Sequence, residues 1–123
     1  MVVTMKCLDT YPLIEIHKQN PLFLSLLKEE LVIPDITLAE FYLYLYKHYN
    51  QLTADYWHKK LTLLCKPVSR EILIKAIIYR YHYKKENLSF FDCVGYMYAQ
   101  EHNILFVTGD SAFQYRQGVE FIA

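Results

Sequence analysis

Short aliphatic and β-branched runs alternate along the chain with longer segments in which apolar and polar residues recur at helical spacing. The short runs predict strands near residues 3–8, 64–68, 104–107 and 119–122. Helical segments separate these runs, and strands joined through helices form parallel sheets with right-handed crossovers. The pattern therefore predicts an α/β fold around a central, mainly parallel sheet.

Polar residues mark the predicted helix starts. A side-chain oxygen just before a helix accepts one of the backbone N–H groups that the first turn leaves unpaired. Proline at the first helical position strengthens this signal, because it has no N–H to satisfy. The predicted caps are Asn20 before Pro21, Thr37, Thr53, Ser69 and Ser89.

Length and charge limit the possible functions. The 123 residues fit one domain over residues 1–123, long enough to bury a core without disulfides. Thirteen basic residues balance thirteen acidic ones, so no overall positive field attracts nucleic acid, and phosphate binding would need a local patch or a metal.

The three cysteines, Cys7, Cys65 and Cys93, lack C-x-x-C spacing and are expected to be reduced core residues. No apolar stretch approaches the length of a membrane span, and no charged leader precedes one, so a cytoplasmic protein is expected. With three glycines, at positions 95, 109 and 118, the chain cannot form a P-loop or a G-x-G-x-x-G turn.

Four carboxylates lie where the predicted elements begin or end. Asp9 and Asp110 each follow an apolar run, so both would emerge at the carboxyl end of a parallel strand, where open α/β sheets bind ligands. Glu40 and Asp92 lie one turn into helical segments and would point to the same edge. At about 5 Å and an effective dielectric near 20, each pair would repel by roughly 3 kcal/mol. A divalent cation is the simplest compensation, and oxygen ligands favour Mg²⁺ or Mn²⁺.

Glu40 and Asp92 also have a purely structural interpretation. Thr37 and Glu40 have the spacing of a capping box, in which the glutamate reaches back to the N–H of the cap. Ser89 and Asp92 have the same spacing, and the helix dipole stabilises an acid in the first turn. Taken singly, each residue could be a cap rather than a ligand.

Asp9 and Asp110 are harder to explain this way, because a carboxylate directly after a buried strand loses its hydration. Asp9 would otherwise cap the following turn, and Asp110 would form an Asx-turn with Ala112. Thr10 and Thr108 adjoin these aspartates, and their hydroxyls would bind a carboxylate, a metal-bound water or a substrate phosphate. The alternative is that Thr10 is only a helix cap and Thr108 only a strand residue.

Aromatic and basic residues suggest interaction surfaces. Residues 41–49 and 79–83 are rich in tyrosine, and rings that alternate along a helix cannot all be buried, so a protein interface or homodimer is expected there. The candidates for phosphate contact are Lys59, Lys60, Arg80, Lys84, Lys85 and Arg116, although a solvated helix face explains them equally well.

With these carboxylates in place, the chain resembles the PIN-domain family of metal-dependent ribonucleases, especially the toxins of VapBC toxin/antitoxin pairs. Three segments carry the resemblance: MKCLDTYPLIEI, ITLAEF and LSFFDCVGYMYAQEHNILFVTGDSAF. The resemblance implies a three-layer α/β/α sandwich, one or two Mg²⁺ or Mn²⁺ ions, cleavage of RNA, and an antitoxin partner. The acidic quartet of the family falls on Asp9, Glu40, Asp92 and Asp110, and its hydroxyl position on Thr108.

The chain departs from the family pattern at two positions. Cys93 replaces the small residue that often follows the third acid, and Ala112 replaces a further aspartate, which puts the number of metal ions in doubt. Two other functions compete with the nuclease. A phosphatase of the haloacid-dehalogenase type would need a second aspartate where Tyr11 stands. A catalytically silent PIN-like interaction domain would keep the fold without the chemistry.

Overall fold

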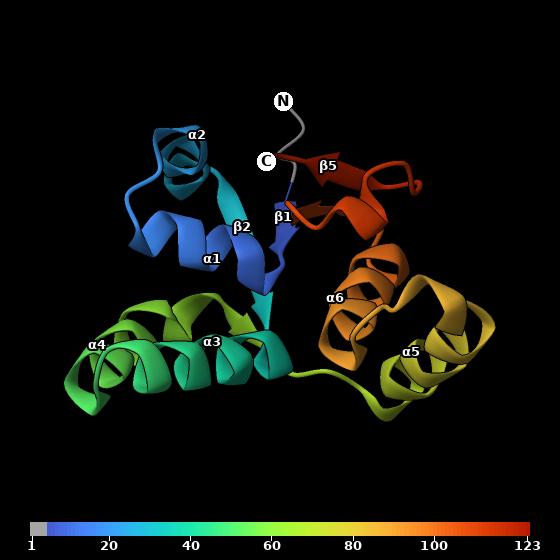
Figure 1. Ribbon diagram of the computed structural model, residues 1–123, viewed down its shortest axis with the longest axis horizontal. Helices are drawn as coiled ribbons and strands as arrows, with labels where there is room; N and C mark the ends of the chain where they lie inside the picture. The colour runs from blue at the N-terminus through green and yellow to red at the C-terminus, as the bar shows by residue number, and fades with distance from the viewer. Residues whose placement is uncertain (1–4) are drawn as a thin grey trace.

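A computed structural model describes residues 5–123 and shows a sheet between two layers of helices (Figure 1). The sheet has five strands in the order β3-β2-β1-β4-β5, and all neighbours pair in parallel. This confirms the predicted three-layer α/β/α sandwich. The strands are β1 (Met5–Leu8), β2 (Glu30–Pro34), β3 (Cys65–Lys66), β4 (Leu105–Thr108) and β5 (Val119–Phe121).

Helices cover both faces of the sheet. The α-helices are α1 (Thr10–His17), α2 (Pro21–Leu24), α3 (Asp35–His48), α4 (Gln51–Leu61), α5 (Arg70–His82) and α6 (Phe90–Glu101). Four short 3₁₀ helices join them: η1 (Ser25–Lys28), η2 (Thr62–Leu64), η3 (Lys84–Glu86) and η4 (Ser111–Phe113). No helix within residues 5–123 is long and apolar enough to cross a bilayer.

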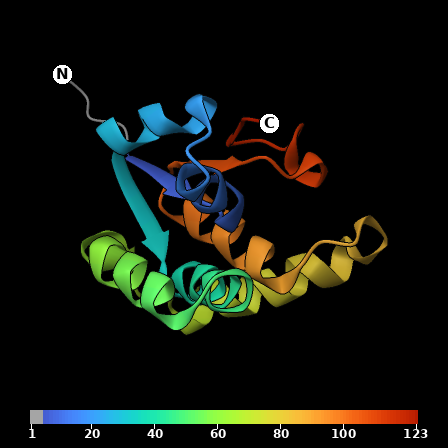
Figure 2. The same ribbon diagram turned by 60° about the vertical axis from the view of Figure 1, so that its left-hand side comes forward.

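Alternation along the strands divides the core in two. In β4, Val107 packs with α1–α4 on one face, whereas Phe106 packs with α5 and α6 on the other. In β1, Leu8 and Cys7 divide in the same way. Successive strand side chains point to opposite faces, so each buried strand contributes to both cores. Figure 2 shows α5, in olive, and α6, in orange, joined by the gold connection at the right of the view.

The observed strands differ from the predicted ones at β2, which the sequence pattern missed. Only Leu31–Ile33 are aliphatic there, between two glutamates and Pro34, so the apolar run is too short to recognise. Residues 3 and 4 of the first predicted strand lie outside the described residues. The strand predicted near 64–68 is reduced to the edge strand β3, because Pro67 lacks the N–H that pairing requires.

Three predicted caps are confirmed: Asn20, Ser69 and Ser89 each accept a backbone N–H of the following helix. The predictions for Thr37 and Thr53 are wrong. Helix α3 begins earlier, at Asp35, so Thr37 is a buried residue inside it and forms no capping box.

Helix α4 also begins earlier than predicted. Asn50 is its cap and accepts the N–H of Thr53 at 2.8 Å. In each helix the N-cap is a residue three positions before the predicted one: Pro34 in α3 and Asn50 in α4. The helix-start pattern therefore recognised a first-turn residue as the cap.

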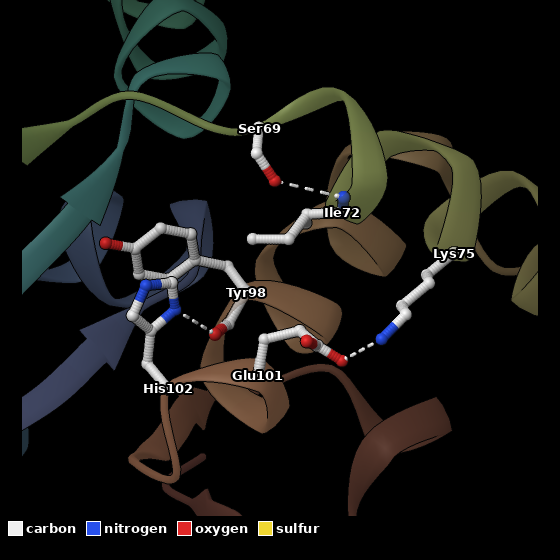
Figure 3. Close-up of polar contacts among 6 residues, drawn as sticks. All are labelled: Ser69, Ile72, Lys75, Tyr98, Glu101 and His102. Atoms are coloured by element: carbon white, nitrogen blue, oxygen red, sulfur yellow. Dashed lines mark hydrogen bonds and ion pairs between the residues drawn. The ribbon is translucent and has the colours of Figure 1, made fainter.

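Helices α5 and α6 run antiparallel, and side chains join the start of one to the end of the other (Figure 3). Lys75 pairs with Glu101, while His102 stacks on Tyr98 with ring centroids 4.1 Å apart. The His102 ring also contacts the Tyr98 carbonyl through Nδ1, at 2.9 Å. These contacts fix the end of α6, whereas Asp92 lies in its first turn.

Candidate functional site

The site begins where the neighbouring strands β1 and β4 end. Leu8 pairs with Val107, which places Asp9 beside Thr108, and the Asp9 N–H donates to the Val107 carbonyl at 3.0 Å. The fully buried Thr108 hydroxyl donates to Asp9 Oδ2 at 2.7 Å. It also accepts the N–H of Asp110 at 3.0 Å. One hydroxyl therefore joins the two aspartates that follow the central strands.

Asp9 is buried at the start of α1. Its Oδ1 accepts the N–H of Thr10 at 2.8 Å, so Asp9 caps α1, the alternative role that the sequence left open, and its role as a metal ligand stays a prediction. Burial raises the pKa of Asp9, and the negative charge of Asp110 adds to the rise, against hydrogen bonds from Thr108 and Thr10 that lower it. The Asp9 carboxylate is therefore buried beside another acid, and among residues 5–123 neutral hydrogen-bond donors but no cation contribute to its pKa shift.

Glu40 reaches the same place from the second turn of α3. The Thr10 hydroxyl donates to Glu40 Oε1, although thirty residues separate the two positions in the chain. Burial raises the pKa of Glu40, and the charge of Asp9 raises it further. The predicted capping of Thr37 by Glu40 is therefore replaced by a contact between α3 and α1.

Asp92 lies in the first turn of α6, where Ser89 accepts its N–H at 3.0 Å. Burial, the charge of Asp9 and a hydrogen bond to Asp9 raise the pKa of Asp92 to about 9, with a smaller contribution from Glu40. Burial and the two neighbouring negative charges therefore favour a proton on the Asp9–Asp92 pair. Two like charges this close cannot both be ionised unless a positive charge joins them.

Asp110 follows β4 and caps the short helix η4. Its Oδ1 accepts the N–H of Ala112 at 3.0 Å, which confirms the predicted Asx-turn. The charge of Asp110 nevertheless acts on Asp9. Asp110 therefore both forms the Asx-turn and contributes negative charge to the surroundings of Asp9.

All four acids line one cavity of about 550 Å³. Its lining is Asp9, Thr10, Tyr11, Ile14, Glu40, Ser89, Asp92, Gly109, Asp110 and Ser111. Thr10, predicted to contact substrate, is part of this lining. Thr108 is not, and its geometry suits positioning of Asp9, so its contact with substrate stays a prediction.

The sequence patterns did not single out Tyr11 or Ser111, which also line the cavity. Gly109 is the available signal for Tyr11: a Cβ at Gly109 would lie 2.2 Å from Tyr11 Cε1. Only glycine allows the Tyr11 ring to pack against this backbone. Gly109, between β4 and Asp110, is therefore the sequence feature that indicates an aromatic side chain at this side of the cavity.

The cavity fits a divalent cation in charge and in chemistry. Its donors are carboxylate and hydroxyl oxygens, and burial together with the charge of neighbouring acids raises the pKa values of Asp9, Glu40 and Asp92. Within residues 5–123, no three acidic, histidine or cysteine side chains already have metal-ligating spacing. Holding an ion would therefore require the carboxylates to rotate toward it, and the proton held between Asp92 and Asp9 would be released to solvent.

Comparison with solved structures gives close matches in fold. A structure described as VapC20 of Mycobacterium tuberculosis, a Sarcin-Ricin loop cleaving toxin, has a TM-score of 0.82 and 14% identity, with 96% of this chain and 99% of that chain covered. VapBC2 from Rickettsia felis, bound to a promoter DNA fragment, has a TM-score of 0.77 and 17% identity, with 98% and 100% covered.

A toxin-antitoxin complex from Klebsiella pneumoniae has a TM-score of 0.76 and 21% identity, with 94% of this chain and 95% of that chain covered. At these identities the likeness establishes the fold alone. No curated protein matches the sequence. The family profile of the PIN domain matches residues 6–118, a span that holds all four carboxylates of the cavity, and the chain therefore belongs to the PIN domain family.

Proposed function

We propose that this protein is a metal-dependent endoribonuclease that hydrolyses RNA phosphodiester bonds with Mg²⁺ or Mn²⁺. The observation that carries the proposal is the gathering of Asp9, Glu40, Asp92 and Asp110 in one cavity, with the pKa of Asp92 raised to about 9. Such an excess of carboxylate charge is expected where a cation completes the site.

Asp9, Asp92 and Asp110 would hold the cation, and Glu40 would hold it as well or orient the attacking water. When bound, the divalent ion lowers the pKa of water and neutralises charge on the phosphate. Thr108 keeps Asp9 in place through its 2.7 Å hydrogen bond. Thr10 donates to Glu40 and lies at the cavity surface, where its hydroxyl could turn to a phosphate oxygen.

We also propose that the protein is the toxin of a toxin/antitoxin pair and acts in the cytoplasm as a homodimer. The structural relatives support this, because they are described as a toxin-antitoxin complex, a toxin and a VapBC assembly. Several large side chains of the tyrosine-rich segments are exposed, which suits a protein interface: Leu43, Tyr46, Tyr49, Tyr81 and Tyr83. A gene for a small DNA-binding protein beside this one would support the pairing.

Cleavage of RNA tests the enzymatic proposal. Wild-type protein should cleave single-stranded RNA with Mg²⁺ or Mn²⁺ and should stop with EDTA. Asp9→Asn should lower the rate by roughly 10²–10³-fold or more, since it removes a central charged group. Asp55→Asn is the matched control, because Asp55 is an exposed acid on α4 outside the cavity.

Cleavage that survives both EDTA and Asp9→Asn would contradict the proposal. The second candidate is the catalytically silent PIN-like interaction domain. It is favoured if wild type binds a partner through the exposed tyrosines and no metal supports cleavage.

A further inference from the structure

A second hollow, of about 590 Å³, lies between α5, η3 and the start of α6. It combines two cationic side chains with aromatic and aliphatic walls, and we call it the cationic hollow. Its lining is Ile77, Arg80, Tyr81, Lys84, Asn87, Leu88 and Phe90. Asn87 ends η3 with a left-handed φ of 56°, which turns the chain back toward α6.

The cationic hollow adjoins the carboxylate cavity across one short segment. Leu88 and Phe90 line the hollow, whereas Ser89 between them lines the cavity. Arg80 Nε donates to the Leu88 carbonyl at 2.9 Å. Figure 1 shows this connection, in gold and orange, leading from α5 to the start of α6. The cavity and the hollow therefore share residues 88–90 as a common border.

The cations of the hollow are available for a ligand. Within residues 5–123, the ion pairs involve Lys6, Lys75 and Arg116, but neither Arg80 nor Lys84. The Lys84 Nζ lies 5.4 Å from the centre of the Tyr81 ring, and Tyr81 is 67% exposed. A cation beside an open ring is suited to a phosphate and a base together.

We propose that the cationic hollow binds the nucleotide next to the scissile phosphate of single-stranded RNA, with Arg80 and Lys84 on phosphate oxygens and Tyr81 stacked on the base. The proposal rests on the proposed nuclease function. A polyanion that approaches four carboxylates is repelled, and the chain has no net positive charge to offset this. Two unpaired cations beside the cavity supply the missing attraction locally.

A protein partner explains the hollow less well than RNA does. The exposed Ile74 and Ile78 continue along α5 but do not line the hollow, so a partner helix could use them without the cations. The hollow places two cationic side chains beside the segment that borders the carboxylate cavity. Phosphate contacts position a nucleic acid, and an aromatic ring binds a base of any sequence.

Binding of an uncleavable 2′-O-methyl RNA, measured by fluorescence anisotropy with Mg²⁺ present, tests the proposal apart from catalysis. Arg80→Gln with Lys84→Gln should weaken binding by roughly tenfold and reduce the salt slope by about 1.4, because two phosphate contacts are lost. The matched control is Lys18→Gln with Lys28→Gln, two exposed lysines that line neither site, which removes the same charge on the other face of the sheet. The control should leave the slope near its wild-type value.

Tyr81→Leu should weaken binding by about fivefold or more, the lower end for loss of one stacked base. Cross-linking with 4-thiouridine RNA should label Tyr81 or Phe90 in the wild type. Melting curves check that each variant folds. Should the Arg80 substitution destabilise the protein, Lys84→Gln with Tyr81→Leu tests the same hollow without it.

The possible outcomes separate this proposal from the nuclease proposal. If the RNA binds through the hollow but cleavable RNA stays intact, the hollow is supported and the nuclease is not. If RNA is cleaved and the hollow variants keep wild-type KM and wild-type binding, the hollow proposal is overturned and the nuclease stands. It is also overturned if both charge-removing pairs weaken binding equally, or if the hollow variants alter only self-association in sedimentation.

Discussion

The carboxylate cavity and the cationic hollow lie side by side but are constructed in opposite ways. Asp9, Asp92 and Asp110 each have backbone contacts or caps that fix their positions at strand and helix ends. Arg80 and Lys84 are exposed on a helical surface, and no carboxylate among the described residues pairs with them. The cavity is therefore expected to couple to stability, whereas Lys84 of the hollow, which has no such backbone contact among the described residues, is expected to affect ligand binding alone.

The largest expected effect on stability is a dependence on pH in EDTA. The pKa of Asp92 is about 9 in the folded protein and near 4 in the unfolded chain. Between these values the folded state binds more protons, so the free energy of unfolding falls as pH rises from about 4 to about 9. Melting curves from pH 5 to pH 8.5 should show this fall in wild type and a much smaller one in Asp92→Asn. Equal slopes in both proteins would contradict the coupling.

Stabilisation by Mn²⁺ is the next effect in size. An ion present at 100 times its Kd stabilises the folded protein by about 2.7 kcal/mol. Asp9→Asn, Asp92→Asn and Asp110→Asn should lose most of this gain. Metal-free Asp110→Asn should be as stable as wild type or more stable, because the charge of Asp110 then no longer acts on Asp9. Melting curves with and without Mn²⁺ measure both quantities.

Asp55→Asn provides the baseline for the metal effect, since it removes an acid outside the cavity. An equal shift with Mn²⁺ in every variant would show that the carboxylates do not share a metal site.

Removal of the Thr108 hydroxyl should have an intermediate effect. Thr108→Val leaves Asp9 Oδ2 without its donor and the Asp110 N–H without its acceptor. A buried polar group that loses its hydrogen-bond partner lowers the free energy of unfolding by about 1–3 kcal/mol. Thermal or urea denaturation should show the loss, and cleavage should fall with it. Thr108→Ser keeps the hydroxyl and should restore cleavage; failure of this rescue would show that Thr108 only fills space.

Lys84→Gln should have the smallest effect on stability, within about 0.5 kcal/mol of wild type, as for other exposed surface positions. Denaturation of this variant beside Thr108→Val tests the contrast between the two sites directly. A loss as large as that of Thr108→Val would show that the cationic hollow is part of the structural framework.

Local signals predicted the helix starts only where no competing residue lay upstream. Asn20, Ser69 and Ser89 are caps in the structure, because each accepts an N–H two or three residues ahead. Thr37 and Thr53 have equally good cap chemistry, but Pro34 and Asn50 start their helices earlier. Which of two nearby candidates starts a helix depends on the path of the chain before it.

Strand β2 shows the same limit for the sheet. Its three aliphatic residues form a weak pattern, and it becomes a strand because its backbone pairs with β1 on one side and β3 on the other. Strand β2 is stable despite its short apolar run because it lies inside the sheet, where neighbouring strands cover both edges and helices cover both faces.

The sequence by itself determined the α/β class, the strands that carry Asp9 and Asp110, and the four acids that line the cavity. These follow from local chemistry: aliphatic runs, and carboxylates directly after them or one turn into a helix. Tertiary structure alone decided that Thr10 meets Glu40, that Thr108 joins Asp9 to Asp110, and that Arg80 donates to the Leu88 carbonyl. Such contacts depend on chain crossovers and helix packing. These bring distant parts of the chain together, so the separation of two residues in the sequence does not predict their distance in space.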